Sequence, residues 1–189
     1  SGLLVVAKND TAHVSLANQI AEKSCKRTYV ALLEGVLKQD EGVIETYIGR
    51  SDQNRTMMAV TREGRVAITH YEVIKRFDRY TLCRFKLETG RTHQIRVHSK
   101  HLGHPIVGDP VYNGKENKFG LKGQLLHAEK LELTHPTTGE RMSFSAPMPD
   151  YFEEVLKKGN LQDRRTIIEQ LIDKIVIDGD DITIHWNFI

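Results

Sequence analysis

The stretch from Glu88 to Asp109, ETGRTHQIRVHSKHLGHPIVGD, constrains the fold most, because residues that interrupt regular structure bound it on both sides. Gly90 ends an apolar strand pattern and Thr92 is a candidate N-cap, so we expect a short helix over Arg91–Leu102. Pro105 forces the preceding residue into an extended conformation, and the Gly-Asp-Pro sequence behind it predicts a turn. A single short helix therefore interrupts a series of strands.

Short apolar patterns separated by turn residues lie on both sides of this helix. Strands are expected at Val30–Leu33, Val43–Ile48, Val66–Ile74, Tyr80–Leu87, Gln124–Thr134 and Met142–Ala146. Short strands joined by tight turns are typical of antiparallel pairing. The sequence therefore predicts a mixed α/β (α+β) fold with a mainly antiparallel sheet flanked by helices and loops.

The first twenty residues combine a strand pattern with a helix pattern. Gly2–Lys8 is a continuous apolar run, which predicts a buried strand. Asn9 or Asp10 can cap a helix whose apolar positions, Ala12, Leu16 and Ile20, recur at helical spacing. Because buried strands normally follow another element, we expect an element upstream of Ser1; a simple N-terminal strand tied into the sheet is the alternative.

Basic side chains are concentrated in the 88–109 stretch, which holds no acidic residue between its first arginine and its last histidine. They are Arg91, His93, Arg96, His98, Lys100, His101 and His104. Helical spacing places His93, Arg96 and Lys100 on one face, and Ile95, His98 and Leu102 on the next. Backbone N–H groups at a helix start, with Arg91 beside them, suit a phosphate or a carboxylate. We therefore expect this helix to meet an anion.

Charge along the chain supports a polyanionic partner. Residues 1–110 hold 17 Lys and Arg against 12 Asp and Glu, a net charge of +5, whereas residues 111–189 hold 10 against 13, or −3. A basic half of this kind is typical of nucleic-acid binding, with an affinity that falls steeply with salt. A solvated basic helix face is the alternative. A metal site is not expected, since the histidine spacings match no ligand pair and neither cysteine is near.

The remaining composition points to a soluble globular domain. Hydrophobic residues make up 39% and charged residues 28% of the 189 residues. No apolar run approaches the ~20 residues of a membrane span, so a cytoplasmic protein is expected. Cys25 and Cys83 lie far apart and form no CxxC motif, which predicts two buried, reduced thiols.

The string TGRTHQIRVH followed by GHPIVGDPVY resembles the signature of the RluA-type RNA pseudouridine synthases. The resemblance extends from Ser1 to about Leu156. The segment KRTYVALLEG matches the family pattern around its active-site tyrosine, which places that role on Tyr29. The order LHAxxL, HP and FxAPxP also follows the family, where the first leucine, here Leu126, helps to line the uracil pocket.

The resemblance implies isomerisation of uridines in structured RNA, either rRNA or tRNA, without a metal or an organic cofactor. It implies catalytic roles for Tyr29 and Arg96. The substrate-binding residues that it implies are Lys26, Arg91, His93, Gln94 and Leu126. No DNA and no membrane partner is expected.

The family's nucleophile is an aspartate in the motif R-L-D-x-x-T-S-G, and this chain begins at the Ser-Gly of that motif. We therefore expect the aspartate just upstream of Ser1, with Arg96 left without the carboxylate it would pair with. Neither Asp10 nor Asp109 is expected to replace it. The chain is thus predicted to be inactive by itself; a non-catalytic RNA-binding module of the same fold is the alternative.

Two domains are expected: a catalytic domain over residues 1–156 and a C-terminal extension over 157–189. A helix at Gln162–Asp173 and strands at Ile175–Ile177 and Ile182–Phe188 would make the extension a helix with a hairpin. The extension is weakly similar to the C-terminal end of large serine recombinases, which implies no function here. A protein-interaction or dimerisation element is the other reading.

Overall fold

The computed structural model describes residues 1–115, 117–158, 172–178 and 181–186. The chain divides into two compact units, Ser1–Pro149 and Asp150–Ile189.

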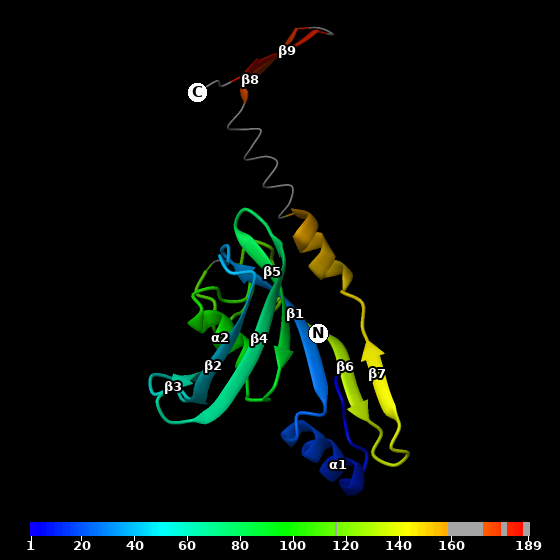
Figure 1. Cartoon of the computed structure of the whole chain (residues 1–189). Helices are drawn as coiled ribbons and strands as arrows, with labels where there is room; N and C mark the ends of the chain where they lie inside the picture. The colour runs from blue at the N-terminus through cyan, green and yellow to red at the C-terminus, as the bar shows by residue number, and fades with distance from the viewer. Residues whose placement is uncertain (116, 159–171, 179–180, 187–189) are drawn as a thin grey trace. The chain divides into compact units, whose positions relative to one another are not determined.

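The first unit is built on one seven-stranded sheet. Its elements in chain order are α1 (Asp10–Ala21), β1 (Lys26–Glu34), β2 (Glu41–Arg50), β3 (Met58–Thr61), β4 (Arg65–Arg76), β5 (Tyr80–Leu87), α2 (Gln94–His101), β6 (Leu126–Thr134) and β7 (Arg141–Ser145). The strands lie in the order β3-β2-β4-β5-β1-β6-β7, and all neighbours are antiparallel (Figure 1). The predicted α+β fold with a mainly antiparallel sheet is confirmed.

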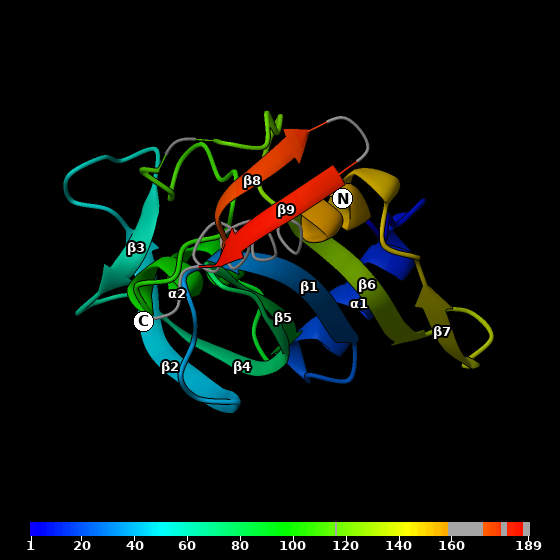
Figure 2. The same cartoon turned by 90° about the horizontal axis from the view of Figure 1, so that it is seen from above.

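Strand β1 is an interior strand of the sheet, paired with β5 on one side and β6 on the other. Its last five residues, Val30–Glu34, are all buried, and both Leu32 and Leu33 are almost inaccessible to solvent. A strand buried on both faces is apolar without alternation, as this run is. Figure 2 shows β3 and β7 at the two edges of the sheet.

Helix α1 forms as predicted, with Asn9 as its N-cap. The Asn9 side-chain oxygen accepts a hydrogen bond from the backbone N–H of Ala12 at 2.9 Å. Leu16 packs in a cluster with Cys25, Leu131 and Leu133. Cys25 and Cys83 are both free and buried, as expected.

The prediction of a buried strand at Gly2–Lys8 is wrong. Only Gly2 pairs with the sheet, through a bridge to Ala128, and the rest of the segment forms no strand. Leu4 and Val6 are 85% and 73% exposed. The side chains that alternate with them, Leu3, Val5 and Ala7, pack on the cluster of α1 and β6 residues. In a continuous apolar run both sides of the segment are apolar, but here only one side packs against other residues.

Helix α2 is shorter and more deeply buried than predicted. It begins at Gln94, three residues later than expected, and its N-cap is His93 rather than Thr92. All side chains from Gln94 to Ser99 are buried, so no basic face runs along the helix. The expected polar face is therefore wrong at its central residue, Arg96; Lys100 and His101 at the helix end are exposed.

In the second unit, residues 150–158 are helical and β8 (Ile172–Asp178) pairs antiparallel with β9 (Asp181–Trp186). The predicted hairpin is confirmed over these strands. The predicted helix at Gln162–Asp173 falls outside the described residues up to 171, and its last two positions belong to β8. Within the described residues, no helix is long and apolar enough to cross a membrane.

Candidate active site

The loop that joins β5 to α2 is held by a single buried amide, that of Gln94. Its oxygen accepts hydrogen bonds from the Arg91 backbone N–H at 2.9 Å and from the Thr89 hydroxyl at 2.8 Å. Its nitrogen donates to Ile68 O at 3.0 Å and to the Thr69 hydroxyl at 2.9 Å. A primary amide offers two donors and two acceptor positions, so all four are used. Gln94, predicted to bind substrate, instead fixes the loop that presents Arg91.

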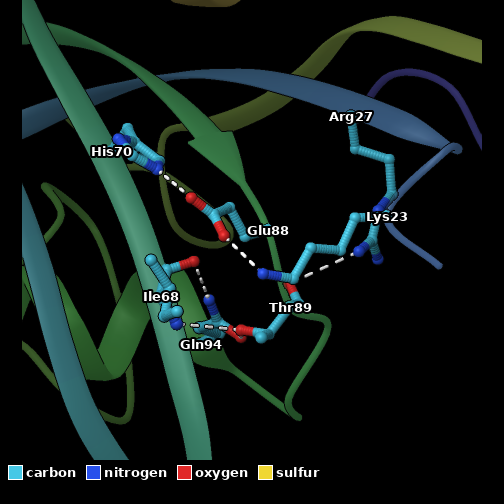
Figure 3. A network of polar contacts seen from close by, with 7 residues as sticks. All are labelled: Lys23, Arg27, Ile68, His70, Glu88, Thr89 and Gln94. Carbon is cyan, nitrogen blue, oxygen red and sulfur yellow. Dashed lines mark hydrogen bonds and ion pairs between the residues drawn. The ribbon is translucent and has the colours of Figure 1, made fainter. Parts of the chain in front are cut away.

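An ionic cluster holds the other end of the same loop (Figure 3). The Glu88 carboxylate contacts Lys23 Nζ and His70 Nε2, each at 2.6 Å. The Arg27 guanidinium donates to Thr89 O at 3.3 Å, and a Cβ at Gly90 would lie 2.8 Å from its Nη1. Gly90 therefore leaves room for the Arg27 side chain, and three segments of the chain meet at residues 88–90.

The cluster makes the unfolding free energy vary with pH in the acidic range. Hydrogen bonds from Lys23 and then His70 lower the pKa of Glu88 from its ordinary value of 4.5 to about 2. A carboxyl group with a lowered pKa stabilises the fold above its unfolded pKa, and this contribution is lost as pH falls through the folded value. We expect the difference in unfolding free energy between the wild type and Glu88→Gln to shrink between pH 4.5 and about pH 2. Urea unfolding at several pH values measures it.

The matched control is Glu140→Gln, because Glu140 is exposed and forms no ion pair within the described part of the chain. Its difference from wild type should be small at every pH. A Glu88→Gln difference that stayed constant down to pH 2 would show that the carboxylate is not engaged as the structure has it.

Tyr29 lies on β1 at the point where the pairing with β6 changes register, between Thr28 and Tyr29. Such a bulge redirects the local side chains and is common beside active sites. Burial raises the pKa of the Tyr29 phenol, and the Arg27 guanidinium opposes that rise. The phenol therefore keeps its proton at neutral pH. Arg27 sits two residues earlier and on the same side of the strand, and its buried Nε has no hydrogen-bond partner among the described residues.

The predicted residues are distributed over the two faces of β1. Ala31 follows Tyr29 on the same face and pairs with Leu126, so the half-buried Leu126 lies on the Tyr29 side. Lys26 is exposed and, by strand alternation, lies on the opposite side. The structure therefore brings Leu126 toward Tyr29 but not Lys26.

Helix α2 covers the Tyr29 face of the sheet. Tyr29 pairs with Phe85 on β5, and Leu87, two residues further on the same face, pairs with Thr69 on β4. Thr69 accepts from Gln94 and contacts His98 Nδ1 at 2.8 Å, which fastens α2 to this face. Both views place α2 beside β2 and β4 (Figures 1 and 2).

Arg96 is paired, contrary to expectation. Its Nε and Nη2 donate to the two carboxylate oxygens of Asp109, each at 2.7 Å, and the side chains are only 10% and 0% exposed. Burial alone would raise the pKa of Asp109, but hydrogen bonds from Arg96 and from the backbone N–H groups of Tyr112 and Val111 lower it overall. The turn after Pro105, which the sequence does predict, delivers this carboxylate.

Tyr112 is a central residue that the sequence reasoning missed. Its ring lies 4.8 Å from the Arg96 guanidinium, and its hydroxyl accepts a hydrogen bond from the Met58 backbone N–H at 3.0 Å. The same hydroxyl is 2.9 Å from His93 Nδ1, so we assign its proton to that bond. Burial and the Arg96 charge both lower the pKa of His93, which agrees with a neutral imidazole that accepts through Nδ1.

His93 and Arg91, at the start of α2, are available to a ligand, as are the exposed Lys100 and His101 at its end. His93 is exposed and has a left-handed backbone with φ of 57°, a conformation that non-glycine residues seldom adopt outside constrained sites. Arg91 donates through Nε to Val66 O at 2.8 Å. Its terminal nitrogens meet no carboxylate in the part of the chain that the structure describes.

The sequence and the fold are similar to those of known proteins. The family model described as "RNA pseudouridylate synthase" matches residues 1–101. An uncharacterised RNA pseudouridine synthase of Bacillus subtilis is 48% identical over 157 residues, which cover 83% of this chain and 52% of that protein. Ribosomal large subunit pseudouridine synthase D of Pseudomonas aeruginosa is 45% identical over 164 residues, covering 80% and 51%.

A solved structure supports the same class of fold. The human protein RNA Pseudouridylate Synthase Domain Containing 1 superposes with a TM-score of 0.66 at 29% identity, over 75% of this chain and 62% of that one. The chain belongs to the RNA pseudouridine synthase family, with an RluA-type catalytic-domain sequence. It spans about half the length of the curated relatives it matches.

Proposed function

We propose that this protein isomerises a uridine in structured RNA to pseudouridine, with ribosomal RNA as the substrate. The observation that carries the proposal is the half-buried Tyr29, beside Arg27 and on the sheet face that α2 covers. The name of the Pseudomonas relative supports the ribosomal substrate.

The reaction requires the base to leave its sugar, rotate and rejoin through carbon, so the uridine must first be extracted from its stack. The Tyr29 ring can stack on an extracted base, which is worth ~1–3 kcal/mol per base. Leu126 would contribute an apolar wall on the same face. His93 at the start of α2 would contact a phosphate beside the target.

The role expected of Arg96 passes to Arg91 in this proposal. Asp109 occupies the Nε–Nη2 edge of the Arg96 guanidinium, whereas the terminal nitrogens of Arg91 meet no carboxylate within the described residues. A nucleophilic carboxylate needs a cation to orient it and hold it ionised. Within the described residues, Arg91 therefore has its terminal donors left for such a carboxylate.

Neither carboxylate of the 88–109 stretch is free to act as the nucleophile. Glu88 is bound to Lys23 and His70, and Asp109 is bound to Arg96. We propose, from the resemblance to the family motif R-L-D-x-x-T-S-G, that the nucleophile is that motif's aspartate, and that the 189-residue chain binds RNA without isomerising it.

The test is release of tritium from RNA labelled at uracil C5. The 189-residue chain should release none, and a longer protein that carries the family's aspartate motif ahead of Ser1 should do so. Ribosomal RNA and tRNA are assayed in parallel, and turnover on tRNA alone would contradict the ribosomal substrate. Turnover by the 189-residue chain would show that one of its own residues is the nucleophile.

A further inference from the structure

Helix α2 is mostly buried, so it exposes little positive charge. Exposed arginines instead lie together at one end of β2. Arg50 is the last residue of β2, and Arg55 lies in the loop to β3. Arg62 lies in the turn after β3, and Arg65 begins β4 opposite Ile48 of β2. Arg91 joins them, since its Nε donates to Val66 O. These five residues are called the arginine edge below.

None of the five forms a salt bridge with a carboxylate anywhere in the described residues. Arg50, Arg55, Arg62 and Arg65 are all exposed. Only Asp52 and Glu63 offset their charge between residues 48 and 66. Like charges held this close repel one another, so the clustering of these arginines does not stabilise the fold. Stability therefore does not explain why they lie together.

The basic residues of this region are also all of one type. Residues 48–66 contain four arginines and no lysine, although the whole chain has nearly equal numbers of the two. Arginine presents a planar fork of donors that matches phosphate oxygens in pairs, whereas lysine is a compact point charge. The composition of this segment therefore favours a ligand with phosphate groups.

Strand β3, which lies between Arg55 and Arg62 in the chain, is fixed to the candidate active site through two contacts. The Met58 backbone N–H donates to the Tyr112 hydroxyl, which also contacts His93. Met57, Met58 and Val60 pack on a cluster of Ile48, Ala67, Val97 and Tyr112. Strand β3 is therefore anchored to α2 and to the residue that caps it.

Gly64 holds the turn between Arg62 and Arg65 against β2. A Cβ there would lie 2.7 Å from Ile48 O, a separation that only a residue without a side chain avoids. The two arginines flank this close crossing within two residues. The backbone from which both arginine side chains extend is therefore held against β2.

We propose that Arg50, Arg55, Arg62 and Arg65 of the arginine edge bind backbone phosphates of the RNA on one side of the target nucleotide, so that RNA is held along β2–β4 as well as at Tyr29. This rests on the proposed function for its choice of RNA as the partner. Phosphate contacts of this kind fix register and orientation without reading the base sequence.

The experiment measures binding of a structured RNA hairpin by fluorescence anisotropy at several salt concentrations. The variant Arg55→Gln, Arg62→Gln, Arg65→Gln is compared with a control of equal charge change, Lys8→Gln, Lys38→Gln, Arg141→Gln. The control cations are exposed; Lys38 lies at the opposite end of β2, and Arg141 lies on the far edge strand β7.

Each lost phosphate contact lowers the slope of log K against log salt by about 1, so the arginine variant should lose about 2 to 3. The control should lose much less. A second variant with lysine at the same three positions should keep most of the slope but bind more weakly than wild type, because the paired donors are lost.

Equal losses in the two glutamine variants would overturn the arginine edge while leaving RNA as the ligand. A wild-type chain with no salt-dependent RNA binding would overturn both the arginine edge and the proposed RNA substrate. Retained RNA binding by the arginine variant together with lost binding of an acidic protein would assign the surface to a protein partner instead.

Discussion

Asp109→Asn is expected to lower the unfolding free energy by about 3–5 kcal/mol, the cost of leaving a buried charge without its partner. Arg96 would keep its guanidinium in a site where it is almost inaccessible to solvent, facing a neutral amide. The change is large because the total stability of a domain this size is only about 5–15 kcal/mol. Urea unfolding followed by circular dichroism measures it.

A double-mutant cycle separates the ion pair from the other bonds of Asp109, whose Oδ1 also accepts from two backbone N–H groups. Arg96→Met should cost less in the Asp109→Asn background than in the wild type. The matched control is Asp78→Asn, since Asp78 and Arg79 form an exposed pair at 3.8 Å that should be worth at most ~1 kcal/mol. Equal effects of Asp78→Asn and Asp109→Asn would show that Arg96 does not depend on Asp109.

This pair also marks the limit of sequence-based inference. The apolar patterns predicted helix α1 and every strand of the seven-stranded sheet except β3, because burial of one face leaves a period in the sequence. No period reveals which carboxylate a buried arginine will meet. Arg96 and Asp109 lie 13 residues apart, and only the turn after Pro105 brings them together. The family motif suggested a partner outside these residues, and no sequence pattern pointed to Asp109.

The prediction of a buried strand at Gly2–Lys8 failed for a related reason. Its composition is that of a buried strand, but a strand also needs a neighbour along its hydrogen-bonding edge. Among the described residues, only its first residues bond to β6, through Leu3 N to Ala128 O and Ala128 N to Ser1 O. Apolar content therefore predicted which side chains could be buried without predicting whether a partner lies there.

The missed site residues had weaker but real signals. Arg27 stands two positions before Tyr29, so strand alternation alone places both on one face. Tyr112 lies in the GDPVY string that carries the resemblance, three residues after Asp109, yet its ring and hydroxyl contacts come from segments more than 15 residues away. Long-range contacts of this kind depend on the finished sheet.

Tyr29→Ala should lower kcat/KM for pseudouridine formation at least ~100-fold in a longer, active form of the enzyme. Loss of the ring removes ~1–3 kcal/mol of stacking, and displacement of the base by about 1 Å can cost a further factor of roughly 100. Tyr29→Phe keeps the ring and removes only the hydroxyl, whose pKa is already raised by burial. It should therefore retain most of the activity if stacking is the role of this residue.

Two comparisons make the test specific to the ring. Phe144→Ala removes an aromatic side chain of similar size from β7, on the far edge of the sheet, and should leave tritium release unchanged. Thermal unfolding of each variant shows whether lost activity follows from lost structure. If Tyr29→Phe were as inactive as Tyr29→Ala while both remained folded, the hydroxyl would take part in the chemistry, and stacking alone would not account for the role of this residue.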